Sequence, residues 1–350
     1  MKINDNYFDE RKMLTLDKLD NVVGDLPEFC VEYFIGIENR TSPLTRLNYA
    51  YDLRVFFNYI VKKKCLNIEV NQITIDFLDT LQTRDFESYL SYLSNYKIGN
   101  ERRSCNERAK ARKLSSVRAL YKFFFNNGKV SANTPEKVSM PKLHEKEIVR
   151  LEVNEVATLL DKVETGDGLT SRQKQYNEIT KVRDIALLTL FLGTGIRISE
   201  LVGLNVTDID FDTDSFVVTR KGGNRAILYF TEETAIALLN WIEQRETLKI
   251  PEEEKALFVS LQNRRMSTRT IQDLVKKYAK VVNPLKRITP HKLRSTFGTN
   301  LYQATGDIYA VADFLGHKDI NTTRKHYAAI NENLRRDIVK NIKLREEDED

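Results

Sequence analysis

Cysteine, histidine and tryptophan are scarce in this 350-residue sequence, and long uncharged apolar stretches are absent. Without such a stretch the chain offers no candidate membrane-spanning helix. Its first residues, MKINDNYFDERKML, lack the apolar core of a signal peptide. The three cysteines, Cys30, Cys65 and Cys105, fall at no paired metal-binding spacing, and an odd, widely spaced set predicts no disulfide framework. Together these absences predict a soluble protein of the reducing cytoplasm, with no membrane partner.

The composition is that of an ordinary globular protein. Hydrophobic residues make up 41% of the chain and charged residues 30%, which excludes intrinsic disorder and allows a sizeable core. The length is enough for two domains. The formal net charge is +5. This mild basic excess is compatible with an anionic partner but does not require one.

Apolar spacing predicts a helical first half and a mixed second half. Helical patterns cover residues 44–61, 75–93 and 109–125, and a polar stretch with Pro135 and Pro141 follows them as a linker. Beyond it we expect helices over 151–163 and 182–192, a loop over 164–181, a strand over 204–211, and a hairpin of 215–220 with 225–230. The expected fold class is mainly α with a small antiparallel sheet, that is, α+β.

One candidate site lies at a predicted helix start. Thr289 and Pro290 form a helix-start signal. They place His291 and Arg294 three residues apart on one helical face, near backbone N–H groups that favour anions. A capped surface helix without any ligand explains this fragment equally well.

Further charged and polar residues have weak signals of their own. Glu200 lies three residues after Arg197 and is placed to orient its guanidinium, although an ordinary surface ion pair gives the same pattern. Lys221 opens a hairpin turn, where a solvated charge is the usual outcome. His317 follows a Leu-Gly pair, and Tyr327 comes ten residues later. A half-buried aromatic is the commoner fate of such a tyrosine.

Taken together, the order Arg…Lys…His-x-x-Arg…Leu-Gly-His…Tyr resembles the catalytic domain of the tyrosine recombinases, the family of phage lambda integrase, Cre and the Xer proteins. The resemblance spans about residues 151–330 and is carried by GTGIRISELVGL, ITPHKLRSTFGTNL and FLGHKDINTTRKHYA. It implies these roles: catalytic residues Arg197, Lys221, His291, Arg294 and His317, the nucleophile Tyr327, and Glu200 in support of Arg197. Ser295 stands where a histidine is common in the family, and Arg220 stands where a glycine is common.

These residue types suit phosphoryl transfer. A phosphodiester in transfer gathers negative charge on its non-bridging oxygens, which two guanidiniums can clamp. Histidines donate hydrogen bonds or move protons near neutral pH, and a phenol becomes a nucleophile beside cations and a proton acceptor. A lysine can protonate the leaving 5′-oxygen. The expected product is a 3′-phosphotyrosyl DNA with a free 5′-hydroxyl, formed without a metal ion, a cofactor or ATP.

A basic stripe in the first half suggests where DNA would bind. Residues 97–113, KIGNERRSCNERAKARK, carry seven basic and two acidic side chains. Such a stripe suits phosphate contacts, and a solvated helix face explains the composition equally well. The resemblance implies a helical core-binding domain that clamps one face of the duplex while the catalytic domain takes the other. The DNA-contact candidates are Thr45, Arg46, Tyr49, Lys110, Arg112, Lys113 and Arg118.

The resemblance also implies a domain plan and partners. The plan is an N-terminal extension over 1–25, a helical core-binding domain over 26–130, a linker over 131–149, a catalytic domain over 150–330, and a C-terminal helix with an acidic tail over 331–350. The expected partners are a double-stranded DNA target site and further copies of the chain in a synaptic homo-tetramer. The C-terminal helix would join those copies, unless it packs on its own domain. Accessory proteins stay open.

The expected function is site-specific recombination through a Holliday junction. Two alternatives are a catalytically silent DNA-binding protein of the same fold and relaxation activity like that of a type IB topoisomerase. Within recombination, the resolution of chromosome dimers and the integration or excision of a mobile element share this architecture. The sequence leaves both roles open, together with the target site and the order of strand exchange.

Overall fold

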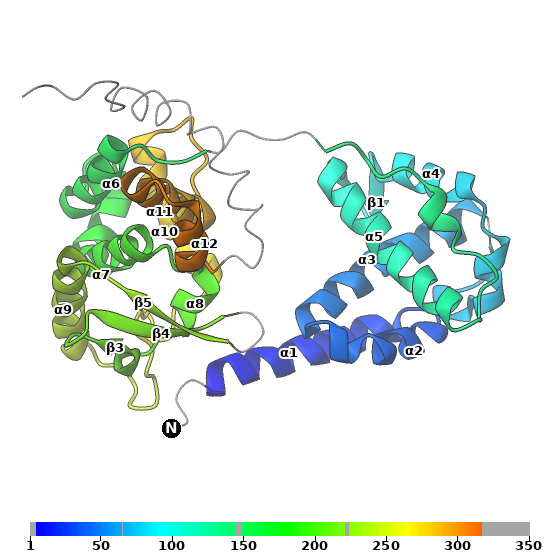
Figure 1. Cartoon of the computed structure of the whole chain (residues 1–350), viewed down its shortest axis with the longest axis horizontal. Helices are drawn as coiled ribbons and strands as arrows, with labels where there is room; N and C mark the ends of the chain where they lie inside the picture. Colours follow the sequence, from blue (N-terminus) through cyan, green and yellow to red (C-terminus); the bar gives the residue numbers. More distant parts are fainter. Residues whose placement is uncertain (1–4, 65, 144–148, 221–223, 317–350) are drawn as a thin grey trace, which may run out of the picture. The chain divides into compact units, whose positions relative to one another are not determined.

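A computed structural model of the chain describes residues 5–64, 66–143, 149–220 and 224–316. The chain divides into two compact units, Met1–Lys146 and Glu147–Asp350 (Figure 1). Both are mainly helical, and the strands in their described parts form small antiparallel sheets, so the predicted fold class is confirmed. Among the described residues no helix is long and apolar enough to cross a membrane.

The N-terminal unit is a set of helices with one short hairpin. Its helices are α1 (Asp5–Gly24), α2 (Phe29–Gly36), α3 (Pro43–Lys63), α4 (Thr83–Tyr92) and α5 (Glu107–Asn126), with the 3-10 turns η1 (Glu38–Arg40), η2 (Val70–Gln72), η3 (Ile75–Thr80) and η4 (Thr134–Lys137). Strands β1 (Tyr96–Ile98) and β2 (Glu101–Arg103) pair antiparallel between α4 and α5. Side-chain caps begin two of the predicted helices. Ser42 Oγ accepts from the Thr45 N–H before α3, and Asn106 Oδ1 accepts from the Ala109 N–H before α5.

An aromatic core holds this unit together. Phe56 on α3 stacks on Phe86 of α4, with ring centroids 5.8 Å apart, and Tyr121 of α5 meets Phe86 edge-on at 5.4 Å. Tyr121 is fully buried, and its hydroxyl donates to Leu78 O at 3.0 Å, so its polar end is satisfied. Full burial of one large apolar side chain stabilises the unit by about 1.5–3 kcal/mol.

The N-terminal unit extends further at both ends than the sequence analysis expected. All of α1 lies within residues 1–25, the expected N-terminal extension, yet it packs against α3 and buries Leu19 and Val22 in the core. Beyond α5, Pro135 and Val138 are buried, so the first part of the expected linker packs on this unit.

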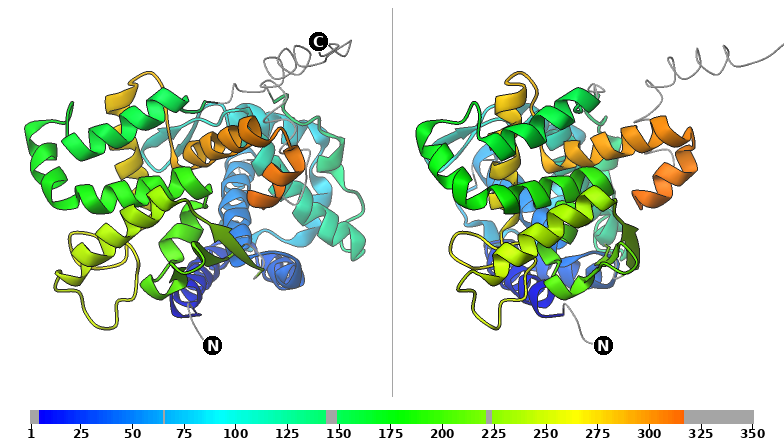
Figure 2. Two further views of the ribbon diagram at one scale, coloured as in Figure 1. Left: turned by 60° about the vertical axis from the view of Figure 1, so that its left-hand side comes forward. Right: turned by 90° about the vertical axis from the view of Figure 1, so that its left-hand side faces the viewer.

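The C-terminal unit is built around α7. Its elements are α6 (Val153–Thr165), α7 (Ser171–Thr194), α8 (Ile198–Gly203), η5 (Val206–Asp208), β3 (Ile209–Asp210), β4 (Ser215–Thr219), β5 (Arg225–Tyr229), α9 (Glu232–Glu246), α10 (Thr268–Val282), α11 (Pro290–Thr305) and α12 (Ile308–Phe314). α7 lies against α6, α9 and α11 (Figures 1 and 2), and its Leu187, Leu190 and Phe191 are fully buried. The sheet has the order β3-β4-β5, and Val217 faces Ile227 across the predicted hairpin.

A buried charge cluster fixes α7 against α10. The fully buried Asp184 accepts hydrogen bonds from Arg183 Nη2 at 2.7 Å and from the Tyr278 hydroxyl at 2.8 Å. Lys277 Nζ lies 3.5 Å from the same carboxylate. Burial lowers the pKa of Lys277, and the charge of Asp184 partly opposes that effect. The cluster holds in place the helix whose C-terminal end leads into the candidate site.

Three predicted elements differ from the structure. The predicted helix over 75–93 is η3 followed by α4, because Gln82 caps a new helix. The predicted loop over 164–181 ends at Thr170, whose hydroxyl caps α7 well before the expected helix start. The predicted strand over 204–211 is reduced to η5 and the short β3. In each case a local capping contact overrides the apolar spacing.

Candidate active site

A sharp turn between α7 and α8 presents Arg197. The turn begins at Gly195, whose φ of +61° is left-handed, and a Cβ there would lie 3.1 Å from Phe297 Cγ and closer still to Cδ1. Glu200 then holds Arg197 twice. Its carboxylate, which is nearly buried, accepts from the Arg197 backbone N–H at 3.0 Å and from Nη1 at 2.8 Å. The guanidinium is therefore oriented by the acid three residues further along, at the predicted spacing.

Arg294 comes from α11 and meets Arg197 at a shared backbone acceptor. Arg294 is buried, its Nη1 donates to Gly195 O at 2.5 Å, and its Nη2 donates to the carbonyl of Leu315. Arg197 Nη2 donates to the same Leu315 carbonyl at 3.2 Å and to Gly316 O at 3.1 Å. The structure thus brings together the two arginines that the resemblance implied, although they lie far apart in the sequence.

His291 lies in the first turn of α11, three residues before Arg294 and on the same helical side. Its side chain is exposed. Its backbone carbonyl accepts a hydrogen bond from Ser295 Oγ at 3.0 Å, so the serine at the family's histidine position serves the helix backbone. Because α11 packs on α7, it carries His291 and Arg294 to the end of α7.

Lys221, His317 and Tyr327 lie outside the described residues, as does the C-terminal helix expected over residues 331–344. Their roles therefore stay predictions. The described chain reaches the positions next to two of them. Arg220 donates its backbone N–H to Asn224 O at 2.7 Å on either side of residues 221–223, and the last described residue, Gly316, directly precedes His317.

The DNA-contact candidates on α3 each have contacts within the N-terminal unit. Arg46 is buried, and its Nη1 lies 2.8 Å from Glu38 Oε1. The Thr45 hydroxyl lies 2.9 Å from Ser42 Oγ, and Tyr49 is half-buried against the core. These contacts give all three side chains a part in the fold, and their contact with DNA stays a prediction.

The candidates on α5 differ in exposure. Arg112 is half exposed and Lys113 is buried, and they bind the Asp52 carboxylate at 2.5 Å and 2.8 Å. Lys110 Nζ donates to a serine hydroxyl at 2.7 Å. Arg118 donates to the backbone carbonyls of residues 135, 136 and 138. Lys113 and Arg118 are therefore tied to the fold, whereas Arg112 keeps half of its side chain in solvent.

The N-terminal unit also has a hollow, and the predicted basic stripe of residues 97–113 provides only part of its lining. It has a volume of about 950 Å³ and opens between α3, α5 and the β1–β2 hairpin. Its lining joins cations and tyrosines: Arg54, Lys62, Lys97, Arg103, Arg112, Lys113, Tyr51, Tyr92 and Tyr96. Burial, reinforced by a hydrogen bond from Cys105, raises the pKa of Tyr96 to about 12, so this phenol stays protonated at neutral pH. The α3 cations lie outside the basic stripe of residues 97–113, and only folding brings them beside it.

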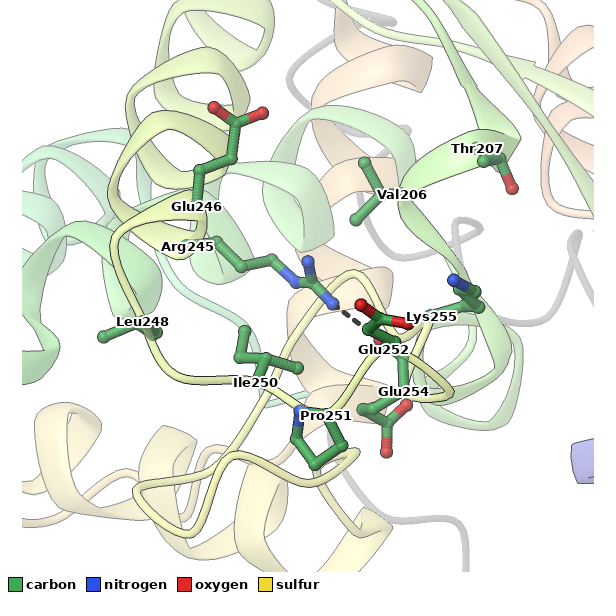
Figure 3. Close-up of a pocket in the computed structure, with 10 residues that line it drawn as sticks. All are labelled: Val206, Thr207, Arg245, Glu246, Leu248, Ile250, Pro251, Glu252, Glu254 and Lys255. Carbon is green, nitrogen blue, oxygen red and sulfur yellow. Dashed lines mark hydrogen bonds between the residues drawn. The ribbon is translucent and has the colours of Figure 1, made fainter.

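A smaller pocket of about 250 Å³ lies where α9 meets the loop that follows it (Figure 3). There Arg245 donates to the carbonyl oxygens of Glu254 and Ala256, each at 3.0 Å. None of the predicted catalytic residues lines this pocket. Across the described ranges, no group of three or more His, Cys, Asp or Glu side chains is arranged to hold a metal ion. The candidate active site is therefore the arginine pair at the end of α7.

Comparison with known proteins identifies the family. Residues 149–333 match the phage integrase family, and residues 31–128 match the N-terminal SAM-like domain of phage integrases. The tyrosine recombinase XerC of Caldanaerobacter subterraneus subsp. tengcongensis is 32% identical over 327 residues, which cover 90% of this chain and 86% of that protein. The fold is that of a tyrosine recombinase. The chain belongs to the phage integrase family.

Solved recombinase structures share this fold. The Tn1549 transposon integrase in complex with circular intermediate DNA aligns with a TM-score of 0.63 at 20% identity, covering 89% of this chain and 99% of that chain. The XerH recombinase in a pre-cleavage complex with its difH substrate aligns with a TM-score of 0.60 at 18% identity, covering 81% and 76%. These likenesses confirm the predicted architecture of a helical N-terminal domain followed by an α+β domain.

Proposed function

We propose that this chain is a site-specific recombinase that cleaves and rejoins double-stranded DNA through a 3′-phosphotyrosyl intermediate and a Holliday junction. The observation that carries the proposal is the meeting of Arg197 and Arg294 at the carbonyl of Leu315. Two guanidiniums held at one acceptor suit the non-bridging oxygens of a phosphodiester, where charge grows in the transition state. An anionic phosphate oxygen is a stronger acceptor for these donors than a neutral carbonyl.

In the proposed cleavage step, the phenolic oxygen of Tyr327 attacks the scissile phosphorus. A bond between phosphorus and the tyrosine oxygen forms, the P–O5′ bond breaks, and the phenolic proton passes to His291 or His317. Lys221 donates a proton to the departing O5′. The products are a 3′-phosphotyrosyl strand and a free 5′-hydroxyl. Arg197 and Arg294 stabilise the charge on the phosphorus oxygens throughout.

Rejoining follows the same path in reverse on a partner strand. A 5′-hydroxyl attacks the phosphotyrosyl phosphorus, a new P–O5′ bond forms, and the tyrosine leaves as a phenol. Because the phosphotyrosyl bond conserves the energy of the cleaved phosphodiester, neither ATP nor a metal ion is needed in this scheme. Two such exchanges between paired duplexes pass through a Holliday junction.

The N-terminal unit supports DNA as the partner. Its hollow gathers cations from α3, the β1–β2 hairpin and α5 around three tyrosines, and clustered cations that neutralise phosphates make binding salt-dependent. The solved XerH structure holds its difH substrate, and the solved Tn1549 integrase structure holds circular intermediate DNA. We extend the proposal to a homo-tetramer in the synaptic complex, joined through the C-terminal helix. Its Leu334, Ile338 and Ile342 recur at helical spacing.

Covalent capture tests the proposal. Genomic DNA from the source organism is sheared, mixed with the full chain in EDTA and denatured in SDS, and the protein-linked fragments are sequenced beside a Tyr327→Phe control. We expect reads at a discrete locus that are absent from the control. A locus near the replication terminus would indicate chromosome-dimer resolution, and element ends would indicate mobility. Binding without adducts even on nicked DNA would contradict the proposal, and relaxation of arbitrary plasmids without strand exchange would favour a topoisomerase.

Arginine variants separate the catalytic role of the arginine clamp, Arg197 with Arg294, from DNA binding. Loss of one preorganised charge-stabilising donor slows a reaction by about 10²–10³, so we expect Arg197→Ala to slow cleavage of a nicked site by that factor and to leave binding intact. Arg269→Ala is the control, because Arg269 is mostly exposed and pairs with Asp273 on its own helix. An Arg197→Ala variant that cleaves at the wild-type rate would remove the clamp from the mechanism.

A further inference from the structure

Three successive carbonyl groups at the end of α12 accept hydrogen bonds from arginines. The two arginines of the proposed clamp use the carbonyls of Leu315 and Gly316. The third arginine is Arg220, at the end of β4, whose Nη2 donates to Phe314 O at 3.0 Å. Arg220 has no part in the proposed chemistry, and the resemblance gave it no role. Its contact nevertheless joins the hairpin to the same short stretch of backbone as the clamp.

The guanidinium of Arg220 fills the space beside Gly316. A Cβ added at Gly316 would lie 2.9 Å from Arg220 Nε and closer still to Cζ and Nη1. The φ of Gly316 is +57°, a left-handed conformation that favours glycine. Arg220 Nε is buried and has no hydrogen-bond partner in the described part of the chain. Close packing on Gly316 and the hydrogen bond to Phe314 O therefore hold this side chain in place.

We propose that Arg220 is a positioning residue for strand cleavage, which fastens the end of β4, directly before Lys221, to the end of α12, directly before His317. The proposal rests on the proposed function, in which Lys221 protonates the leaving O5′. Both ends of the link are anchored. The Arg220 N–H is paired with Asn224 O at 2.7 Å, and Phe314 O is one of the last carbonyls of α12, where a cation is favoured.

The link matters because proton transfer depends steeply on distance. An acid must come within hydrogen-bond reach of the leaving oxygen, and a misplacement of about 1 Å costs about 100-fold in rate. β4 and β5 are strands of five residues each, so few backbone pairs hold the end of the hairpin. Loss of the Arg220 contact removes its hydrogen bond to α12. Proton delivery should then slow, while the arginine clamp and DNA binding remain.

A sulfur-substituted substrate separates this role from a general structural one. When sulfur replaces the bridging 5′-oxygen of the scissile phosphate, the leaving thiolate needs no proton, because thiols are far more acidic than alcohols. We expect Arg220→Ala in the full chain to cleave the oxygen substrate about 10- to 100-fold more slowly than the wild type. It should cleave the sulfur substrate at nearly the wild-type rate. Lys221→Ala should show the same rescue, and Arg197→Ala should not.

Matched variants keep the test decisive. Arg225→Ala is the control, because Arg225 is exposed on the facing strand, and it should cleave both substrates at wild-type rates. Arg220→Lys keeps one charged donor for Phe314 O, should recover part of the oxygen-substrate rate, and carries the comparison if Arg220→Ala does not fold. Equal losses on both substrates, or no loss on either, would overturn the positioning role.

Failure of the proposed function has a different signature. If the wild type forms no phosphotyrosyl adduct with either substrate, the recombinase mechanism fails and the role of Arg220 fails with it. If the wild type cleaves but the sulfur substrate does not restore the cleavage rate of Lys221→Ala, then Lys221 is not the acid. In that case, a restored rate for Arg220→Ala alone would contradict the link between Arg220 and Lys221.

Discussion

Asp52→Asn should destabilise the N-terminal unit strongly, because it leaves a buried lysine without its counter-charge. Asp52 is fully buried. Its carboxylate accepts hydrogen bonds from Lys113 Nζ at 2.8 Å, Arg112 Nη1 at 2.5 Å and Ser116 Oγ at 3.1 Å. The side chain of Lys113 is 8% exposed and that of Arg112 is 51% exposed. The substitution therefore strands one cation rather than two, since Arg112 can return to water.

The size of the effect follows from this geometry. Removal of one partner from a buried ion pair costs about 3–5 kcal/mol. Asparagine keeps one acceptor oxygen for the donors, and the half-exposed Arg112 is resolvated, so the lower end of that range applies. For a unit of this size, each kcal/mol of lost stability lowers Tm by roughly 2–4 °C, so a loss of about 3 kcal/mol lowers Tm by about 6–12 °C.

The single tryptophan makes the assay specific to one unit. Trp241 is buried in the C-terminal unit, where its indole N–H donates to Leu257 O at 2.8 Å, so its fluorescence follows that unit. Far-UV circular dichroism of the full chain follows both units. In thermal unfolding we expect Asp52→Asn to lower the transition seen only by circular dichroism and to leave the Trp241 transition in place.

Two comparisons make the result interpretable. Asp25→Asn is the matched control: Asp25 pairs with Arg54 in the same unit, but both side chains are exposed, and surface pairs contribute about 0–1 kcal/mol. Combining Asp52→Asn with Lys113→Met should recover most of the lost stability, because no buried charge is then unpaired. If Asp52→Asn lowers Tm no more than Asp25→Asn does, the reasoning from the buried lysine is refuted.

Three further predictions concern acid stability, the segment after α5 and the turn before Arg197. Burial opposes ionisation of Glu155, but hydrogen bonds from Lys286, the Glu152 N–H and Asn283 outweigh it and hold its pKa below 4.5. The stability that the ionised Glu155 contributes is present above pH 4.5 and is lost as the pH falls through its folded-state pKa. Glu155→Gln should therefore reduce the acid-induced loss of stability that Trp241 fluorescence reports for the C-terminal unit. An unchanged loss of stability at acid pH would contradict this role of Glu155. Arg118→Ala frees three backbone carbonyls and should raise tryptic cleavage after Lys137 severalfold, with little change in DNA affinity; a variant that lost DNA affinity without faster cleavage would assign Arg118 to DNA instead. Gly195→Ala should lower Tm and cleavage rate together, at a cost of about 1–3 kcal/mol for the strained turn, whereas Gly24→Ala, whose methyl group meets nothing within 4 Å, should affect neither.

Sequence patterns predicted the elements whose cause is local. The helical apolar spacing of α5 and the two strands of the β4–β5 hairpin are examples. Helix α7 shows where prediction from apolar spacing fails. Its first half carries Asn177 and Thr180, which lie in the segment predicted as a polar loop. Both are buried: Asn177 Oδ1 lies 2.6 Å from the Tyr278 hydroxyl of α10, and the Thr180 hydroxyl donates to Asp184. The Thr170 cap thus begins α7 early, and Tyr278, which is distant in the sequence, provides a polar partner for a side chain that the helix buries.

The functional residues follow the same division between local and distant contacts. The bond between Arg197 and Glu200 spans a single turn, so spacing alone predicted it. The meeting of Arg197 with Arg294 at Leu315 depends on packing between helices, and only resemblance to a family pointed to it. A basic stripe is a weaker guide still, because Asp52, 61 residues away, takes up the charge of Lys113. The DNA-binding capacity of such a stripe therefore depends on how far internal ion pairs take up its cations, and here Arg112 keeps half of its side chain in solvent.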